Sequence, residues 1–319
     1  MKILFMGTPT AAAVSLQRLI DDGHEIVAVY TQPDRPSGRG NRVQMSAVKE
    51  LAIERGLTVV QPAKLKPEES KAEFRSVGAD VAVVVAYGRI LPAAYLDAFK
   101  YGAINVHFSL LPKYRGAAPV NWAIVNGEAT TGVTTINMDV GLDTGDILIQ
   151  SEAAIGAAES SVQLMDQLAV LGAETLANTL TQLDSLVPEP QDHKSATFAP
   201  IMKKADGQID WSMSAIEVER RIRGFQPFPS SFSYIDCSRV TFFAGKAMDL
   251  DSDEKVGAIL SSSNGELVVK CGSHTAISIL ELQLEGKRRV GCQDAINSGK
   301  FAVGKVFGGI ELRCQTKFR

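Results

Sequence analysis

The sequence lacks the features that mark membrane-bound or secreted proteins. Its longest strongly apolar run covers residues 81–86, far short of the roughly 18 residues that a membrane helix needs. The first six residues show neither the basic start nor the apolar stretch of a signal peptide. The formal net charge is only −3, which is too small to indicate nucleic-acid or membrane binding through bulk charge. These absences favour a cytoplasmic protein with no membrane partner.

Cysteine is also scarce. The chain has four, and none of them forms a C-x-x-C pair or has a histidine at metal-ligand spacing. A zinc site or a disulfide framework is therefore not expected. We interpret the cysteines as small buried residues and expect no metal.

The glycines of a dinucleotide-binding loop are missing as well. The first expected strand, residues 2–6, ends in Gly7-Thr8-Pro9, where such a protein carries G-x-G-x-x-G. The sequence therefore predicts a Rossmann-like sheet without NAD.

What the first half does contain is an alternation of apolar strands and amphipathic helices, which is typical of a mostly parallel sheet covered by helices. Ser160 is placed to cap the longest helix. The expected strands are residues 2–6, 26–30, 58–60, 80–86, 103–106, 131–138 and 147–152, and the expected helices are residues 11–22, 48–55 and 160–183.

The pattern changes after a stiff, polar, proline-containing stretch at residues 187–200. Beyond it one helix, residues 216–225, precedes five short strands, and Asn264-Gly265 is a strong hairpin signal between two of them. The strands are expected at residues 231–235, 240–244, 257–261, 266–270 and 276–284. Such spacing predicts a small OB-like β-barrel. The fold class is thus α/β, with a Rossmann-like domain (1–186), a linker (187–204) and a smaller OB-like barrel domain (205–319).

Two stretches of the first domain carry candidate chemistry. Asn105 and His107 lie two apart at the end of an expected strand, so they project to the same side, and α/β sheets bind ligands at the carboxyl ends of parallel strands. Asp143 lies in a loop rich in glycine and aspartate that follows another strand. An amide, an imidazole and a carboxylate together suit acyl transfer. Each of these residue types is more often a structural hydrogen-bonding or turn-forming residue, and the pattern alone leaves both interpretations open.

At these residues the sequence resembles a known family. Asn105-x-His107, residues 109–112 and Asp143 resemble the folate-dependent formyltransferases. The ordered set of further motifs is similar to the methionyl-tRNA formyltransferases within that family, and the resemblance covers essentially the whole chain. These motifs are Gly7-Thr8-Pro9, residues 31–36, Gly38-Arg39-Gly40, residues 86–88 and 90–92, residues 115–119, Ile209-Asp210-Trp211 and residues 285–289.

The resemblance implies an enzyme that uses 10-formyltetrahydrofolate as co-substrate and formylates methionyl-initiator tRNA, acting as a monomer. It implies that Asn105, His107 and Asp143 are catalytic. It also implies that the folate site is lined by two groups of residues: Ser109, Leu110, Leu111 and Pro112, and Tyr87, Gly88, Ile90 and Leu91. No covalent enzyme intermediate is implied, so no nucleophile is expected.

RNA contacts are expected at two places. The loop of residues 32–46 carries Arg35, Arg39 and Arg42, and in the family a loop here approaches the acceptor end of the tRNA; basic side chains suit phosphates. Residues 285–319 hold eight basic and three acidic side chains, and Lys287, Arg288 and Arg289 are the expected tRNA-binding residues there.

The chain departs from the family pattern at two positions. Residues 41–47 lack the prolines that stiffen this loop in many relatives. Arg89 is bulkier and more charged than expected beside a folate pocket, and we expect it to point to solvent.

Other functions remain open at this point. The trio also suits a formyltransferase for amino-sugar nucleotides, a folate-hydrolase module of a larger dehydrogenase, or a glycinamide ribonucleotide formyltransferase. The basic glycine-rich loop argues against the first two, and the barrel domain argues against the third. A non-catalytic RNA-binding protein that reuses the fold is disfavoured because all three catalytic residue types are present.

Overall fold

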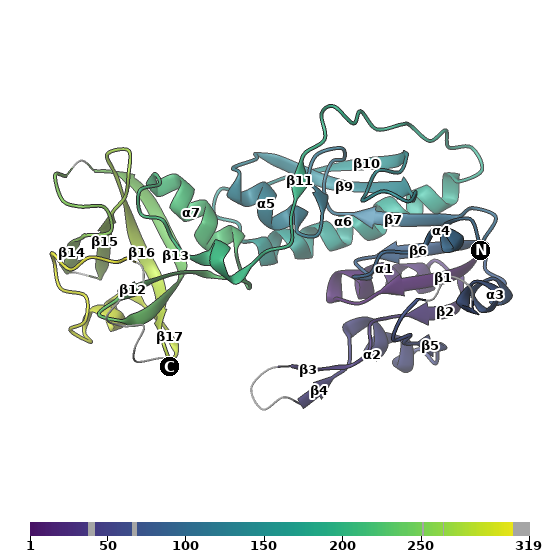
Figure 1. The fold of residues 1–319 in the computed structure, drawn as a ribbon, viewed down its shortest axis with the longest axis horizontal. Helices are drawn as coiled ribbons and strands as arrows, with labels where there is room; N and C mark the ends of the chain where they lie inside the picture. Colours follow the sequence, from purple (N-terminus) through teal and green to yellow (C-terminus); the bar gives the residue numbers. More distant parts are fainter. Residues whose placement is uncertain (38–41, 66–68, 251, 264, 309–319) are drawn as a thin grey trace. The chain divides into compact units, whose positions relative to one another are not determined.

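A computed structural model of the chain describes residues 1–37, 42–65, 69–250, 252–263 and 265–308 (Figure 1). It divides into two compact units. The first comprises Met1–Pro119, Thr130–Ala154 and Leu164–Ala199. The second comprises Val120–Ala129, Ile155–Gln163 and the chain from Pro200 onward.

The first unit is built on a seven-stranded sheet with the order β10-β9-β7-β6-β1-β2-β5, visible as a stack of arrows in Figure 1. Five of the strands run parallel, while β9 is antiparallel to β7 and β10 is antiparallel to β9. The predicted Rossmann-like, mostly parallel sheet is therefore confirmed. The strands are β1 (Lys2–Gly7), β2 (Glu25–Tyr30), β5 (Val59–Val60), β6 (Val81–Val85), β7 (Ala103–His107), β9 (Thr130–Asn137) and β10 (Ile147–Ala154).

Helices cover this sheet because its strands are apolar on both faces; β6 and β7 are buried along their whole length. On one face, Leu4, Met6, Val84 and Ala103 pack in a core with Phe74 of α3. On the other, Gly172 of α6 approaches Val106 of β7. The helices of the first unit are α1 (Thr10–Asp21), α2 (Ala47–Glu54), α3 (Glu69–Ser76), α4 (Ala93–Leu96) and, from Leu164 onward, α6 (Ser161–Gln182). Helix α5 (Pro119–Val125) falls almost wholly in the second unit.

The caps of two helices follow from their sequence. Ser46 Oγ accepts a hydrogen bond from Lys49 N at the start of α2, at 3.1 Å. Before α6, the side-chain oxygen of Gln163 accepts a hydrogen bond from Ser160 N, and Ser160 Oγ accepts one from Gln163 N at 3.4 Å. The predicted role of Ser160 as a cap is confirmed.

The second unit holds an antiparallel sheet with the order β12-β13-β16-β15-β14, and β17 pairs with β16. Residues 305–308 close it, because Val306 bridges to Ala258 and Gly308 bridges to Tyr234 of the opposite edge strand. The predicted barrel is thus present, and Trp211, Phe242 and Phe307 form the aromatic centre of its core. Its elements are η1 (Lys204–Gly207), α7 (Ala215–Gly224), β12 (Ser231–Ile235), β13 (Ser238–Asp249), β14 (Ile259–Ser263), β15 (Glu266–Lys270), β16 (Thr275–Leu284), β17 (Arg289–Gly291) and α8 (Cys292–Ile296).

The structure corrects several predicted elements. The arginine-containing stretch expected as a loop holds a hairpin, β3 (Arg35–Ser37) paired with β4 (Arg42–Gln44). The strand expected at residues 240–244 is the much longer β13. Elements α3, α4, α5, α8 and β17, together with the short pair β8 (Arg115–Gly116) and β11 (Phe198–Ala199), were not predicted. Most are too short to show a period in the sequence.

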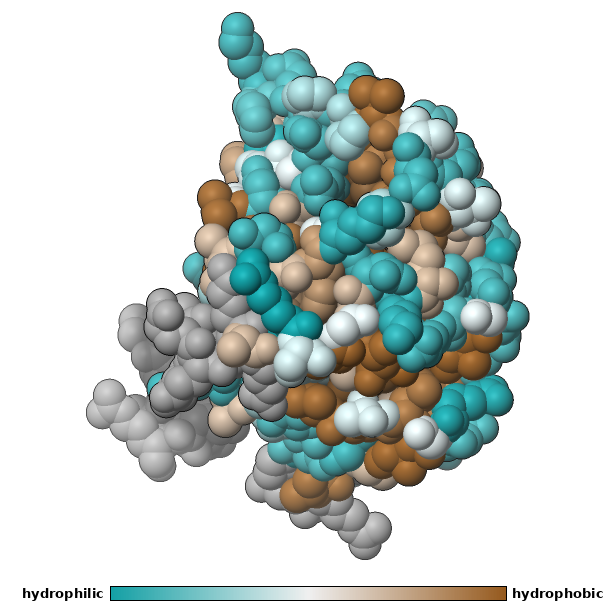
Figure 2. Space-filling model, turned by 90° about the vertical axis from the view of Figure 1, so that its right-hand side faces the viewer, coloured by the Kyte–Doolittle hydropathy of each residue, from teal (hydrophilic) through white to brown (hydrophobic). Residues whose placement is uncertain are grey.

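Among the residues that the structure describes, no helix has both the length and the apolar character to cross a bilayer. The surface seen in Figure 2 is mostly hydrophilic, with separate apolar patches.

Candidate active site

Strand β7 delivers the first two candidate residues. Asn105 and His107 alternate with Val106 along the strand, so they share the face on which Ala103 packs with the α3 and α4 core. They lie at the carboxyl end of β7 and are 9% and 6% exposed. The predicted pairing of the two side chains on one side of the strand end is what the structure has.

Asp143 comes from the loop between β9 and β10. Asp139 holds this loop closed, since its Oδ1 accepts hydrogen bonds from Gly141 N at 2.9 Å and Thr144 Oγ1 at 2.6 Å. A side chain at Gly145 would meet the Asn137 carbonyl oxygen at 1.9 Å, which explains the glycine there. Asp143 itself has a φ of +53°, a conformation that aspartate tolerates better than most residues. The loop is thus shaped to present this one carboxylate.

The structure brings the imidazole and the carboxylate together. His107 Nδ1 lies 3.6 Å from Asp143 Oδ2, and the same oxygen accepts a hydrogen bond from Gly116 N at 2.8 Å. His107 Nε2 lies 2.9 Å from the Tyr114 carbonyl oxygen, and because a carbonyl only accepts, Nε2 must carry the proton. In the neutral ring Nδ1 therefore has a free lone pair, and it becomes a donor facing Asp143 only when the ring is protonated.

Asn105 is the unpaired member of the trio. Its side chain makes no hydrogen bond to any other residue within the described parts of the chain. A nearly buried amide that is left free in this way can donate to an oxygen of a ligand without first breaking a bond in the protein. The trio therefore offers one free amide beside an imidazole–carboxylate pair.

Two further residues brace the site. The sequence placed Arg115 in a family motif without giving it a role, and it gave Gln191 no part in the site. Arg115 is 4% exposed, and its guanidinium donates to Gln191 Oε1 at 3.0 and 2.6 Å. The amide nitrogen of Gln191 in turn donates to the carbonyl oxygens of Asp143, at 2.9 Å, and Gly145, at 2.7 Å. Gln191 thus links the buried arginine to the backbone of the Asp143 loop. It lies in the stretch predicted to be a linker, which gave no sign of this contact.

Substitution of Gln191 should test this brace. Gln191→Ala leaves buried hydrogen-bonding groups unpaired and should lower the free energy of unfolding by about 1–3 kcal/mol. Misplacement of the Asp143 loop should also lower kcat by about 10- to 100-fold. Gln191→Glu is the informative companion, because it keeps an acceptor for Arg115 and loses the donor to the loop. Chemical denaturation should therefore show that Gln191→Glu regains much of the stability that Gln191→Ala loses, while steady-state kinetics should show that it regains less of the lost kcat. Equal recovery of both would contradict the role given to the amide nitrogen.

The predicted folate residues 109–112 form a turn that is fixed from inside. Thr134 Oγ1 donates to the Ser109 carbonyl oxygen at 2.6 Å and accepts from Leu111 N at 3.0 Å. Ser109 and Leu111 are buried, while Leu110 and Pro112 are partly exposed. A ligand in this region would therefore meet Leu110 and Pro112 before the other two.

The second predicted group, in the loop between β6 and α4, is divided in the same way. Tyr87 and Leu91 are 1% and 4% exposed, whereas Ile90 is 85% exposed. Burial raises the pKa of the Tyr87 hydroxyl. Gly88 has a φ of +79°, which only glycine adopts freely. The surface available to a ligand here is that of Gly88 and Ile90.

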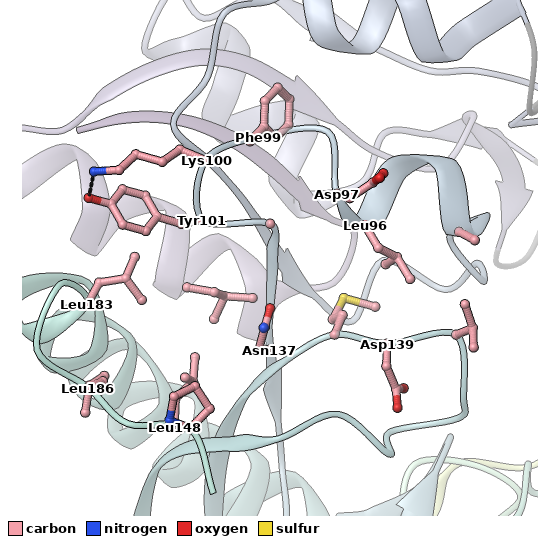
Figure 3. A pocket seen from close by; sticks show the side chains of 16 residues that line it. Leu96, Asp97, Phe99, Lys100, Tyr101, Asn137, Asp139, Leu148, Leu183 and Leu186 are labelled. Atoms are coloured by element: carbon pink, nitrogen blue, oxygen red, sulfur yellow. Dashed lines mark hydrogen bonds between the residues drawn. The ribbon is translucent and has the colours of Figure 1, made fainter. Parts of the chain in front are cut away.

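A cavity of about 630 Å³ lies where the Asp143 loop begins (Figure 3). Its walls come from α4, the turn before β7, Met138 and Val140 of the loop, and the segment that follows α6. None of the eight predicted folate residues lines it. Its rim carries a cluster in which Lys100 contacts the Tyr101 hydroxyl, which donates to Asp184 Oδ1 at 2.6 Å. Most of the other lining residues are apolar, although Asn137 and Asp139 also contribute to the walls.

The structure describes only some of the predicted tRNA-binding residues. Lys287 and Arg288 are exposed in the turn between β16 and β17. Arg289 pairs with Glu281 and lies 4.4 Å over the Phe243 ring, so its charge is partly engaged. Arg35 is exposed at the start of β3. Arg39 and the side chain of Arg42 lie outside the described residues.

The cysteines within the described residues, Cys237, Cys271 and Cys292, take no part in this arrangement. Burial raises the pKa of Cys271 to about 12 and also raises that of Cys292, so both stay protonated and unreactive at neutral pH. Cys237 is disulfide-bonded, and the prediction of small buried thiols is wrong for it, because sequence spacing does not reveal which cysteines folding brings together. In the described ranges, no three His, Cys, Asp or Glu residues cluster as metal ligands do.

Both halves of the chain are similar to known proteins. Residues 1–180 match the family described as formyl transferase, and residues 201–300 match its C-terminal domain. A methionyl-tRNA formyltransferase of Citrifermentans bemidjiense is 47% identical over 97% of this chain and 96% of its own length. One from Caldanaerobacter subterraneus is 46% identical over 96% of this chain and 99% of its own length.

The chain belongs to the methionyl-tRNA formyltransferase family. Solved structures agree on the fold of this enzyme. The sugar 3-N-formyltransferase WlaRD, solved with dTDP and 5-N-formyltetrahydrofolate, has a TM-score of 0.65 and 19% identity, covering 90% of this chain and 99% of its own. A Helicobacter canadensis N-formyltransferase in complex with folinic acid and dTDP-3-aminofucose has a TM-score of 0.64 and 18% identity, covering 88% of this chain and 98% of its own.

Proposed function

We propose that this enzyme transfers the formyl group of 10-formyltetrahydrofolate to the α-amino group of methionyl-initiator tRNA. The product is N-formylmethionyl-tRNA for translation initiation. The observation that carries the proposal is similarity to methionyl-tRNA formyltransferases at 46–47% identity along nearly the whole chain, including the second unit. A folate-type donor is further supported by the folate compounds in the complexes of WlaRD and the H. canadensis enzyme.

The trio suits direct transfer between two nitrogens. The methionyl amine attacks the formyl carbon, and a C–N bond forms as the carbonyl oxygen gains negative charge. Asn105 donates its free amide to that oxygen, and His107 helps to stabilise the negative charge that develops on it. Asp143 takes the proton that the amine loses, and the proton passes to N10 of the folate as the C–N10 bond breaks. No residue of the chain becomes covalently attached.

We also propose a division of labour along the chain. Residues 1–186 form the catalytic domain, 187–204 the linker, and 205–319 the tRNA-binding domain, in a monomer that acts in the cytoplasm. The predicted folate residues 87, 88, 90, 91 and 109–112 then wall the donor site beside the trio. Arg35, Arg39 and Arg42 face the acceptor end, and Lys287, Arg288 and Arg289 face the tRNA body.

The donor is tested by following release of tetrahydrofolate in the presence of methionyl-initiator tRNA. We expect 10-formyltetrahydrofolate to release one tetrahydrofolate for each tRNA that is formylated. We expect no release from 5-formyltetrahydrofolate, because the formyl group of that compound is not on N10, the leaving nitrogen. Tetrahydrofolate release without tRNA at the same rate would instead indicate a hydrolase.

Arg42→Ala should raise KM for the tRNA about tenfold while leaving the affinity for 5-formyltetrahydrofolate unchanged, because loss of one phosphate contact weakens RNA binding only. Arg75→Ala, which removes an exposed arginine of α3, is the matched control. Steady-state kinetics at two salt concentrations should show a weaker salt dependence for Arg42→Ala alone. If both variants have the same KM for the tRNA, Arg42 does not contact the acceptor end.

A further inference from the structure

Gln32 lies two residues after the end of β2, and all of its polar groups are engaged. Its amide nitrogen donates to the Tyr87 carbonyl oxygen at 3.0 Å, and its amide oxygen accepts from Arg89 Nε at 3.1 Å. Its backbone N–H donates to Thr8 Oγ1 at 3.4 Å, and its carbonyl oxygen accepts from Gln61 Nε2 at 2.8 Å. One side chain thus holds two points of the β6–α4 loop.

Arg89 does not point to solvent as predicted. It is half-buried, and its Nη1 donates to the Pro62 carbonyl oxygen at 2.8 Å while Nε binds Gln32. The arginine therefore spans from its own loop to the segment that follows β5. This explains a departure from the family pattern that had no account in the sequence.

The loop held in this way contains two residues in the left-handed region, Ala86 at φ +44° and Gly88 at φ +79°. For alanine that conformation is unfavourable, so it persists only where neighbouring contacts impose it. The Tyr87 carbonyl between them accepts from both Gln32 and Thr8 Oγ1, the latter at 3.2 Å. Both bonds fix the segment that leads to the exposed Ile90.

The same network reaches the base of the β3–β4 hairpin. Gln61 Nε2 bridges the Gln32 carbonyl oxygen and Asp34 Oδ1, each at 2.8 Å. Asp34 Oδ2 also pairs with Lys49 Nζ of α2 at 2.5 Å. The hairpin starts at the next residue, Arg35. Continuous hydrogen bonds therefore join the hairpin base to the β6–α4 loop through Gln32.

We propose that Gln32 is a positioning residue that couples the β6–α4 loop to the β3–β4 hairpin, so that donor and acceptor are held in register. This rests on the proposed function, in which the loop walls the formyl-donor site and the hairpin meets the acceptor end of the tRNA. Because its polar groups all bind other protein atoms, we assign Gln32 no contact with a reacting group. It acts through Tyr87 and Arg89 on one side and through Gln61 on the other.

The coupling is measured as the change in affinity for 5-formyltetrahydrofolate when initiator tRNA is present. By calorimetry on the full chain, we expect tRNA to tighten binding of this analogue about tenfold in the wild type. In Gln32→Ala the analogue should bind about tenfold more weakly, and the effect of tRNA should fall below twofold. Arg89→Leu, a milder change near the surface, should reduce the same coupling by about half on a logarithmic scale.

Gln17→Ala is the matched control. Gln17 also bonds an arginine and a second polar group, accepting from Arg55 Nη2 at 2.8 Å and donating to Asp21 at 2.6 Å, away from the loop. It should leave both affinities and the coupling unchanged. Full coupling in folded Gln32→Ala, or an equal loss in Gln17→Ala, would overturn the proposal.

The outcome is separable from the proposed function. Binding of 5-formyltetrahydrofolate needs no transfer, so weaker binding in Gln32→Ala reports on the loop even if another acceptor is the true one. Wild-type enzyme that binds the analogue but never formylates tRNA would refute the acceptor. In that case we would expect Gln32→Ala only to weaken the binding of 5-formyltetrahydrofolate, with no effect on coupling to the tRNA.

Discussion

Asp143→Ala should lower kcat for formyl transfer by about 10³-fold, the range that a positioned acid–base group contributes. The carboxylate lies beside His107 and has its own backbone donor in Gly116, and it is the group that we propose takes the proton from the amine. Rapid-quench measurement of a single turnover would isolate the chemical step from tRNA release.

Asp143→Asn makes this test sharper. Asparagine retains an oxygen for the Gly116 N–H, so the loop should keep its shape while the base is lost. Both variants should bind 5-formyltetrahydrofolate within about threefold of the wild type, because the loss is confined to the reaction. An Asn variant with a near-normal rate would show that the Asp143 carboxylate only holds the loop.

Asn105→Ala should lower kcat by about 10²- to 10³-fold, as expected when one donor to a developing oxyanion is removed. The effect on folding should be small by comparison, because the side chain has no partner among the described residues whose hydrogen bond would be lost. Thermal unfolding and single-turnover rates on the same preparation would show this separation.

Asn105→Asp is the control for Asn105→Ala, because it changes the charge of the side chain and not its size. It is nearly the same size, but it would place a negative charge where charge develops, so it should be at least as slow as the alanine variant. If Asn105→Ala is markedly less stable and the aspartate variant is active, Asn105 is a structural residue and the oxyanion assignment fails.

The sequence predicts the sheet and the location of the trio because both depend on local patterns. β6 is an unbroken apolar strand, and the alternation along β7 places Asn105 and His107 together without knowledge of the fold. The barrel strands are also visible from alternation and from the Asn264-Gly265 signal. Here local preference and tertiary structure agree.

What the sequence does not reveal depends on contacts between distant segments. Gln191 lies in a polar, proline-containing stretch, and only folding places its amide between Arg115 and the Asp143 loop. Arg89 looks out of place until Gln32 and the Pro62 carbonyl are seen around it. Helix α3 was missed because it is almost wholly polar, with Phe74 as its one buried anchor among its described side chains.

The most direct test of the central claim is a transfer assay that compares three acceptors. The purified enzyme is mixed with 10-formyltetrahydrofolate and either methionyl-initiator tRNA, a methionyl-elongator tRNA or an amino-sugar nucleotide. We predict rapid formylation of the initiator tRNA, little of the elongator tRNA and none of the sugar. Transfer to the sugar nucleotide but not to the initiator tRNA would contradict the account, although the roles of Asn105, His107 and Asp143 would stand.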